Sequence, residues 1–476
     1  MVRSPRTGSK WLAAVAIAGL AAACSSRPGS ATGDDGGIPD CCISDGTPPG
    51  FDAPPPTGLF PLGASSTGGY LVTADGHPFL LHGEAAWSLI VQLTTAGTME
   101  YLADRHSRGV NAILVNLVEA FYSDHPPSNA AGDAPFTTKD DFSTPSEAYF
   151  AHADQVIDLA ASQGMAVLLF PSYLGLMAQE GWRDQMTAMG ATAGAPKCAS
   201  YGRYLGQRYA GKQNIVWMWG GDYMPTAGSS LETCMKAISD GILAMAPARP
   251  VVRASAHWSM QTTSWDEQAF RSSIDAVGVY TYNLALPPCR SARAQTAMPT
   301  YLIETCYEND MYGRCPAIGD VRRQQWWSML GCGAGEIYGV EGLWQFSSTW
   351  PQKLGSPVSV GEQRLSAIVQ QVAWQTLTLD DALVTAGRGT SGNVDEVAAA
   401  RTADHKQAVI YIPPNGAAQI TVALSRMSGP VTATWQDPTA DQSVAAGSGL
   451  SGSHVFQTPG VNKGRDTDWV LVLSAP

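Results

Sequence analysis

The sequence predicts an α/β protein in which a (β/α)8 TIM barrel is followed by a small all-β sandwich domain. Across residues 61–378, apolar runs of strand length alternate with amphipathic stretches of helical length, which is typical of a parallel barrel. Across residues 379–476, short runs alternate between apolar and polar residues, which indicates antiparallel strands. A doubly wound open sheet is the alternative for the first region. It requires a glycine-rich nucleotide loop after the first strand, and the sequence has none there.

Residues 70–73 and 79–82 are expected to form a hairpin around a turn at Asp75-Gly76. The second arm of this hairpin is expected to continue as the first barrel strand. The other barrel strands are expected at residues 111–118, 165–170, 214–222, 250–256, 275–282, 300–304 and 335–346. Helices are expected where apolar residues recur at helical spacing, at residues 98–108, 146–163, 201–209, 231–244, 321–330 and 363–376. In this order residues 214–222 form the fourth strand and residues 300–304 the seventh.

The C-terminal region predicts a sandwich with strands at residues 407–412, 419–424, 431–435 and 469–473. In the third of these, Val431, Ala433 and Trp435 alternate with two threonines, as a half-buried strand requires.

The N-terminal residues predict an export signal. Three basic residues precede the apolar stretch 11–23, which is too short to span a bilayer, and small residues then lead to Cys24. This pattern over residues 1–24 resembles a bacterial lipoprotein signal with Cys24 as the lipidated residue, and an ordinary cleaved signal is the alternative. Residues 25–60 are rich in Gly, Pro and Ser and predict a disordered linker. We expect an outer-membrane or cell-surface lipoprotein, or a secreted protein, whose contact with a membrane is through the lipid anchor.

The composition argues against several classes of function. The formal net charge of −12, with no basic cluster beyond the N-terminus, disfavours binding to nucleic acid. Eight cysteines besides Cys24 in an exported chain suggest disulfides, whose pairing the sequence does not give. Their spacing matches no zinc site and no HExxH motif occurs, so no metal and no cofactor is expected. We expect a monomer.

Two strand ends carry candidate catalytic acids. The fourth strand is an apolar run that breaks at Gly220-Gly221 and is followed directly by Asp222, and the seventh ends in Glu304. Although a lone Asp after two glycines is more often a turn residue, the strands of a barrel all open onto one face, so the fold would bring these two acids together. Cleavage of a glycosidic bond needs such a pair of carboxyl groups. Asp222 and Glu304 are therefore the candidate catalytic pair, with Glu119 and Glu308 as rivals.

Aromatic residues gather near the same strand ends. Sugar rings stack on aromatic planes, so this bias predicts a carbohydrate-binding cleft, although any single one of these residues can equally belong to the core. The expected substrate-binding residues are Glu84, Trp87, Glu119, Trp219, His257, Trp258, Tyr280, Tyr282, Tyr307, Trp344 and Gln345. His82 is a further candidate hydrogen-bond donor in the cleft.

Four segments, residues 83–89, 215–222, 303–308 and 338–346, resemble the landmarks of apiosidase-like glycoside hydrolases (glycoside hydrolase family 140), which are (β/α)8 barrels. Two further motifs, WQDP at 435–438 and DWVLVL at 468–473, resemble the collagen-binding-type β-sandwich that often follows that barrel. The resemblance covers nearly all of the chain after residue 65.

The resemblance implies that Asp222 is the general acid/base and that Glu304 is the second carboxylate, the nucleophile. The chain departs from the family in having Glu84-Ala85-Ala86 for Asp-Thr-Ala, and Ile303 and Thr305 for a Gly and a Pro around Glu304. We expect these positions to border the pocket and to bear on which sugar is released.

Taken together, these observations predict an exo-acting, apiosidase-like and retaining glycoside hydrolase that acts on plant or microbial polysaccharide. The alternative is a non-catalytic carbohydrate-binding protein of the cell surface, which would lack a cleft shared by the two acids.

Overall fold

The computed structural model describes residue 51 and residues 54–245 and 251–476. The predicted signal peptide, Cys24, Cys41, Cys42 and most of the predicted linker lie outside the described residues. Within the described ranges, no helix combines the length and the apolar character needed to cross a bilayer.

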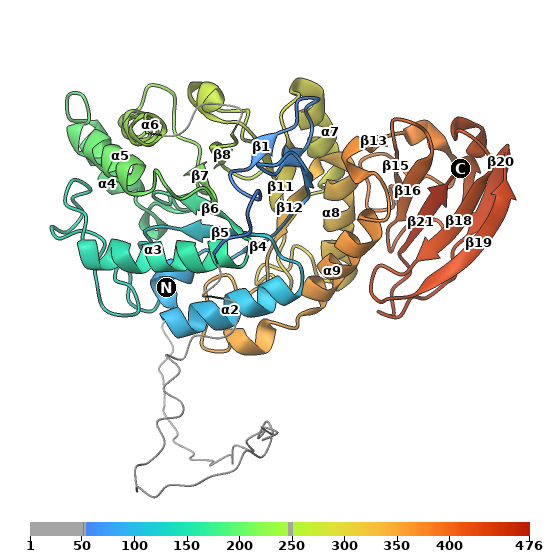
Figure 1. The fold of residues 1–476 in the computed structure, drawn as a ribbon, viewed down its shortest axis with the longest axis horizontal. Helices are drawn as coiled ribbons and strands as arrows, with labels where there is room; N and C mark the ends of the chain where they lie inside the picture. The colour runs from blue at the N-terminus through green and yellow to red at the C-terminus, as the bar shows by residue number, and fades with distance from the viewer. Residues whose placement is uncertain (1–50, 52–53, 246–250) are drawn as a thin grey trace, which may run out of the picture. The chain divides into compact units, whose positions relative to one another are not determined.

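The predicted barrel is confirmed (Figure 1). One sheet runs in the order β8-β7-β6-β5-β4-β12-β11-β10-β9, in which every pair from β8 to β10 is parallel and β9 is antiparallel to β10. Its strands are β4 (Leu81–Ala85), β5 (Ala112–Asn116), β6 (Ala166–Phe170), β7 (Ile215–Gly220), β8 (Ala254–His257), β9 (Thr262–Thr263), β10 (Val277–Tyr280), β11 (Thr300–Glu304) and β12 (Gly333–Tyr338). All except β9 correspond to the eight predicted barrel strands, and most of their side chains are buried on both faces, as a parallel barrel requires.

A serine side chain joins β8 to β10, where the ladder of strands would otherwise leave a gap. The Ser264 hydroxyl donates to the carbonyl oxygen of Ala256 (2.6 Å) and accepts from the amide of Gly278 (2.7 Å). The amide of Asp275 also donates to the carbonyl of Ala254 (2.9 Å). These bonds close the barrel.

Helices surround the barrel (Figure 1). They are α1 (Leu89–Gln92), α2 (Thr95–Ser107), α3 (Glu147–Ser162), α4 (Arg183–Gly190), α5 (Pro196–Arg208), α6 (Ser230–Leu243), α7 (Leu286–Gln295), α8 (Ile318–Gly331) and α9 (Pro357–Val369). Single 3-10 turns occur at Ala178–Glu180, Gln268–Ser273, Trp350–Lys353, Trp374–Thr376, Asp381–Leu383 and Leu424–Arg426. Three helices were not predicted: α1 and α4 are too short to show a helical period, and α7 begins with two prolines and buries few residues.

Short strands precede the barrel. β1 (Gly63–Ala64), β2 (Leu71–Val72) and β3 (Pro78–Phe79) form an antiparallel sheet, in which β2 and β3 are the predicted hairpin.

The predicted C-terminal sandwich is confirmed as two antiparallel sheets. The larger has the order β13 (Thr378–Leu379), β15 (Ala398–Arg401), β16 (Gln407–Ile412), β21 (Trp469–Ser474), β18 (Val431–Gln436) and β19 (Ser443–Leu450); the smaller has the order β14 (Val384–Ala386), β17 (Gln419–Ala423) and β20 (Ser453–Gln457). Val431, Ala433 and Trp435 of β18 point into the core between the sheets, together with Phe456 of β20.

Helix α8 is buried from Val321 to Gly331 because the sandwich covers its outer side. The ring of Trp326 stacks on Tyr411 of β16 at 5.5 Å. The Arg322 guanidinium pairs with Asp468 (2.6 Å) and Asp466 (2.9 Å). The sandwich and the barrel are therefore joined by both an apolar and a charged contact.

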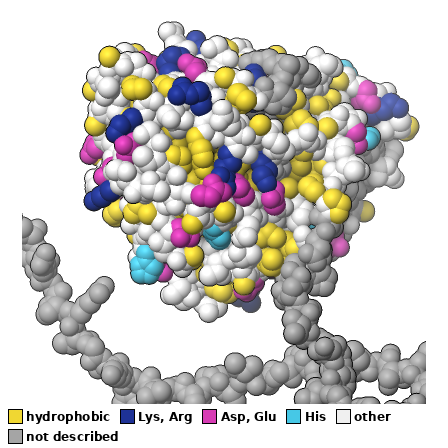
Figure 2. All heavy atoms as spheres, turned by 60° about the vertical axis from the view of Figure 1, so that its left-hand side comes forward, with side chains coloured by type: hydrophobic (Ala, Val, Ile, Leu, Met, Phe, Trp, Pro, Cys, Tyr) yellow, Lys and Arg dark blue, Asp and Glu magenta, His cyan; other side chains and the backbone are white. Residues whose placement is uncertain are grey.

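Three disulfides lie in the barrel region, which confirms the expectation of disulfides for six cysteines. Cys198–Cys234 joins α5 to α6, Cys289–Cys332 joins α7 to the end of α8, and Cys306–Cys315 closes a loop that follows β11. On the face shown in Figure 2, acidic and basic side chains lie beside one another among hydrophobic ones.

Candidate active site

Strand β7 delivers Asp222 through a left-handed turn. Gly220 (φ +94°), Gly221 (φ +97°) and Asp222 (φ +54°) all have positive φ. A Cβ on Gly220 would clash with the carbonyl oxygen of His257, and one on Gly221 would clash with the Tyr173 ring. Both positions therefore require glycine, and Asp222 pays about 1 kcal/mol or more for its left-handed backbone. Backbone strain of this kind is concentrated at functional sites.

The structure brings Asp222 and Glu304 together, with His257 beside them. Glu304 is the last residue of β11, and His257 is the last residue of β8. One carboxylate oxygen of each acid and one ring nitrogen of His257 all lie within 4.8 Å of one another. Asp222 is 9% exposed and Glu304 is 5% exposed, so both carboxyl groups are largely withdrawn from water.

His257 links the two acids. The backbone amide of Asp222 lies 3.0 Å from His257 Nδ1, and His257 Nε2 lies 3.0 Å from Glu304 Oε2. Because a backbone amide can only donate, Nδ1 is the acceptor and the neutral ring carries its proton on Nε2, which donates to Glu304. The imidazole thereby positions the strained Asp222 turn and the Glu304 carboxylate relative to each other.

A different tyrosine donates a hydrogen bond to each of the two acids. The Tyr282 hydroxyl donates to Glu304 Oε1 (2.7 Å), so both oxygens of Glu304 accept a hydrogen bond. The Tyr173 hydroxyl donates to Asp222 Oδ2, while the buried Oδ1 of Asp222 has no hydrogen-bond partner among the described residues. Glu304 is thus held as an acceptor, and Asp222 keeps one oxygen that can carry a proton.

The surroundings of Glu304 raise the pKa of its carboxyl group. Burial and the neighbouring Asp222 carboxylate raise the pKa of Glu304, against which hydrogen bonds from His257 and Tyr282 act. Two buried carboxyl groups at this distance titrate as a pair and do not ionise together readily. The pKa of Glu304 therefore lies above the usual range of a glutamate.

The two acids open into a cavity of about 390 Å³ at the carboxyl ends of the strands. Its lining residues are Trp87, Asn116, Phe121, Tyr122, Tyr173, Leu176, Glu180, Asp222, Tyr280, Tyr282, Glu304, Tyr307, Asp310, Met311, Tyr312, Arg314, Glu341, Trp344 and Gln345. Trp87 is fixed by a hydrogen bond from its Nε1 to the Tyr307 hydroxyl (2.8 Å). Of the predicted binding residues, Trp87, Tyr280, Tyr282, Tyr307, Trp344 and Gln345 line this cavity, and His257 lies behind Glu304.

Glu84 does not line the cavity. Strand alternation places Leu81 and Ala85 in the barrel interior and directs Glu84 toward α2. There its carboxylate pairs with Arg105 (2.9 Å) and accepts from Tyr101 (2.7 Å), with no exposure to solvent.

Three more of the predicted binding residues lie outside the cavity. Glu119 is buried and accepts from the Ser88 hydroxyl and the Ser123 amide. Trp219 and Trp258 belong to the core between strands and helices.

The structure also places several other predicted or neighbouring residues away from the cavity. Glu308 points away from the cavity and accepts from the Val358 amide (2.9 Å). His82 faces Glu362 of α9 at 3.5 Å. Ile303 and Thr305 are buried and, like Glu84, do not line the cavity, so these departures from the family pattern do not contact a sugar there.

Most of the cavity residues that sequence reasoning missed lie on loops after β5, β6 and β11. The disulfide-closed loop after β11 supplies Asp310, Met311, Tyr312 and Arg314. The only sequence signal for them is their position after a barrel strand, because the loops at that end build the site.

Among the described residues, Asp222, His257 and Glu304 are also the group whose atoms lie close enough to hold a metal ion together. A metal there would replace the hydrogen bond from His257 Nε2 to Glu304.

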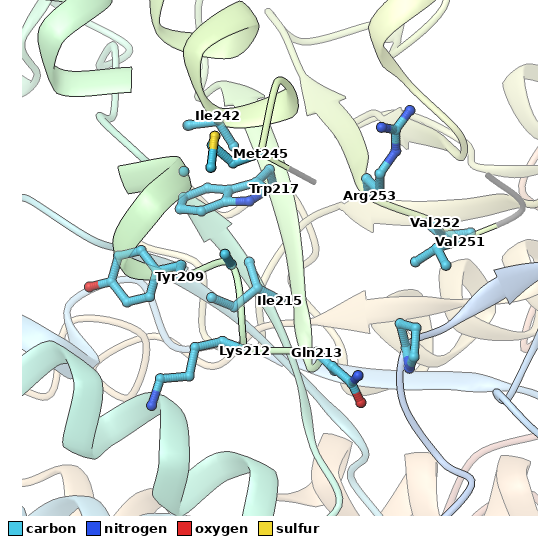
Figure 3. Close-up of a pocket in the computed structure, with 13 residues that line it drawn as sticks. Tyr209, Lys212, Gln213, Ile215, Trp217, Ile242, Met245, Val251, Val252 and Arg253 are labelled. Atoms are coloured by element: carbon cyan, nitrogen blue, oxygen red, sulfur yellow. The ribbon is translucent and has the colours of Figure 1, made fainter. Parts of the chain in front are cut away.

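A second pocket, of about 290 Å³, lies at the opposite ends of the strands, where β7 and β8 begin (Figure 3). Tyr209, Ile215 and Trp217 lie on one side of it and Arg253 and Val252 on the other. The described part of its lining contains no Asp, Glu or His, so it offers no acid pair there.

Two family models match the chain. The model described as "Apiosidase-like, catalytic domain" matches residues 65–383, and the model described as "Putative collagen-binding domain of a collagenase" matches residues 380–474. No curated protein matches the chain.

Solved structures of glycoside hydrolases share the fold. One described as a glycoside hydrolase is 20% identical with a TM-score of 0.72, and the match covers 88% of this chain and 98% of that one. A glycoside hydrolase family 5 protein from Bacteroides vulgatus is 21% identical with a TM-score of 0.73, covering 87% and 93%. A GH27 β-L-arabinopyranosidase from Geobacillus stearothermophilus is 12% identical with a TM-score of 0.50, covering 86% and 98%.

Proposed function

Because the chain belongs to the apiosidase-like family and is therefore a glycoside hydrolase, we propose that it removes terminal sugars from plant or microbial polysaccharide with retention of configuration. Asp222 is the proposed general acid/base and Glu304 the proposed nucleophile. The observation that carries this proposal is the approach of the two carboxylates to within 4.8 Å in one aromatic-walled cavity.

The separation supports retention over inversion. Retaining enzymes hold their two carboxyl groups about 5–5.5 Å apart, whereas inverting enzymes leave about 6.5–9.5 Å for a water molecule. An oxygen of each acid lies within 4.8 Å of an oxygen of the other, which is nearer to the retaining separation than to the inverting one. The cavity volume of about 390 Å³ suits one terminal sugar and the first part of its leaving group, which supports exo action.

In the first step, an oxygen of ionised Glu304 attacks the anomeric carbon while the bond to the leaving-group oxygen breaks and Asp222 gives its proton to that oxygen. The product is a sugar covalently bound to Glu304 and a free alcohol. In the second step, Asp222 takes a proton from water as the water oxygen attacks the anomeric carbon, and Glu304 leaves as a carboxylate. The proton and the charge return to their starting places.

The hydrogen bonds support this division of roles. Both oxygens of Glu304 accept hydrogen bonds from Tyr282 and His257, which favours its ionised form. Oδ1 of Asp222 is the buried oxygen without a partner among the described residues, so it is the oxygen free to exchange a proton with a leaving group.

We also propose that the protein acts outside the cytoplasm, held by a lipid on Cys24 or secreted. The three disulfides of the described region support an oxidising environment. Labelling of the expressed protein with a radioactive fatty acid tests the anchor, and equal labelling of a Cys24→Ser variant would exclude it.

A panel of aryl glycosides and pectic side-chain oligosaccharides, assayed with the wild type and with separate Asp222→Ala and Glu304→Ala variants, tests the proposed function. We expect the wild type to release one sugar and both variants to lose nearly all activity. Glu308→Gln is the matched control, because Glu308 is a buried acid near Glu304 that faces away from the cavity. Full activity in either alanine variant would remove the assignment.

A further inference from the structure

A line of aromatic rings runs from Asp222 to solvent. Tyr173, whose hydroxyl donates to Asp222, has its ring centre 6.1 Å from that of Tyr122, and Tyr122 lies 5.3 Å from Phe121. All of these rings line the cavity. Tyr173 is buried, Tyr122 is half-buried and Phe121 is 48% exposed, so the line passes from the reacting centre to the mouth of the cavity.

The outer end of this line is an exposed apolar surface. Leu176, on the loop after β6, also lines the cavity and is 44% exposed. Exposed large apolar side chains gathered at a cavity mouth indicate a surface that is covered when a ligand binds.

The role of Asp222 as the acid determines which part of the substrate lies beside the Tyr173–Tyr122–Phe121 line. The acid must reach the oxygen that joins the two sugars, so the leaving group lies beside Asp222. The opposite wall is next to Glu304, where Tyr282 donates to the carboxylate and the Arg314 guanidinium lies 3.4 Å from the centre of the Tyr282 ring. The Tyr173–Tyr122–Phe121 line is therefore on the leaving-group side.

The charges of the cavity restrict what can bind there. Among the residues that the structure describes, its lining contains five acids (Glu180, Asp222, Glu304, Asp310 and Glu341) and one basic residue, Arg314, which is already paired with Asp310 at 2.6 Å. Glu180 stands on the leaving-group side, buried, with one oxygen accepting from the Met177 amide (2.9 Å). An anionic sugar would be repelled here, whereas the hydroxyls of a neutral sugar can donate to a carboxylate.

We propose that Phe121, Tyr122 and Leu176 form a subsite for a neutral sugar unit on the leaving-group side of the scissile bond. One apolar face of that sugar packs on Phe121 and Leu176, and its hydroxyls reach Glu180. This subsite rests on the proposed function, because its place is defined by the roles of Asp222 and Glu304.

The test compares two leaving groups on the one sugar that the wild type releases: fluoride, which has no ring to pack, and a neutral hexose joined as a disaccharide. We expect Phe121→Ala and Leu176→Ala each to lower kcat/KM about 10-fold for the disaccharide and to change it less than about twofold for the glycosyl fluoride. Met177→Ala is the matched control, because Met177 is 50% exposed and adjacent to Leu176 but does not line the cavity. It should leave both substrates unchanged.

Each result has a distinct meaning. Equal losses on fluoride and disaccharide, or no loss on either, would overturn the subsite while leaving the proposed function in place. Faster cleavage of the corresponding uronic acid disaccharide than of the neutral one would overturn the choice of a neutral sugar. A wild-type protein that cleaves no glycoside at all would overturn the proposed function and the subsite with it.

Discussion

Glu84 and Glu304 are both buried acids near the carboxyl ends of barrel strands that are separated by β12, yet their surroundings differ. Glu84, on β4, lies 2.9 Å from the buried Arg105 guanidinium and accepts from Tyr101. Glu304, on β11, accepts from Tyr282 and His257 and faces a cavity that it shares with a second acid. Among the described residues, no Lys or Arg side chain lies within 4.0 Å of the Glu304 carboxylate, and its ion-pair partner is His257.

The difference shows what separates a structural acid from a reactive one. Burial raises the pKa of Glu84 and the Arg105 guanidinium acts against that rise; removing the cation from such a buried pair is strongly destabilising. A buried carboxylate that is held only by neutral donors beside another acid can change its protonation state, which catalysis at two carboxyl groups requires.

The largest expected effect is on activity at the cavity acids. We expect Glu304→Gln to lower kcat/KM at least about 10⁴-fold and Asp222→Asn to lower it about 10²–10⁴-fold. The free energy of unfolding should stay the same or rise, because each change removes a repulsive charge from the pair. Kinetics and chemical denaturation of the same preparations measure both quantities. If stability fell in parallel with activity, Asp222 and Glu304 would be structural acids like Glu84, and the distinction between the two kinds of acid would fail.

The next effect is on stability at Glu84. We expect Arg105→Met to lower the free energy of unfolding by about 3–5 kcal/mol, because it leaves a buried carboxylate without its cation. Activity per folded molecule should be unchanged. Glu84→Gln combined with Arg105→Met should recover part of the loss. Asp104 pairs with both Arg105 and Arg108. Arg108→Met is the control, because Arg108 is partly exposed, and it should cost less than about 1 kcal/mol.

The smallest expected effect concerns a third kind of buried acid, the pair Glu336 and Glu362. Burial, and then the negative charge of Glu336, raise the pKa of Glu362 well above its usual range, and burial raises the pKa of Glu336. Neighbouring His82 adds no positive charge, because burial and Arg105 lower its pKa to about 4.

The sign of the pH dependence follows from these shifts. The folded state holds protons that the unfolded chain releases above the ordinary pKa of Glu, about 4.3, so the stability contributed by the protonated pair is lost as pH rises from there through the folded pKa. Glu362→Gln mimics the protonated form. We expect its Tm to exceed that of the wild type by about 2–4 °C at pH 8 and by less at pH 5. Equal differences at the two pH values would show that the pair holds no extra proton.

Strand alternation explains both the successes and the failures of sequence analysis. The eight barrel strands were predictable because runs such as residues 215–220 are apolar on both faces. The same alternation places Val216 and Met218 inside the barrel and Trp217 and Trp219 against the helices, which excludes Trp219 from the cavity. The alternation of side chains along the strand could therefore have predicted that Trp219 and Glu84 face away from the cavity.

The loops carried no such signal. Tyr173 and Arg314 reach the cavity through tertiary contacts of loops after β6 and β11, and no periodicity describes those loops. The meeting of Asp222 and Glu304 was predictable because the barrel places strand ends on one face. The hydrogen bonds that distinguish the two acids depend on His257, Tyr173 and Tyr282, whose orientations require coordinates.

The proposed mechanism requires Glu304 to form a covalent bond to the sugar, so the most direct measurement is to trap that bond. The wild type is incubated with the 2-deoxy-2-fluoro glycosyl fluoride of the sugar that it releases, digested, and analysed by mass spectrometry. We predict a gain of one fluoroglycosyl unit on the peptide that contains Glu304, and no gain in Glu304→Gln. A label on Asp222 or Glu308, or an unlabelled enzyme that releases sugar of inverted configuration, would contradict the account.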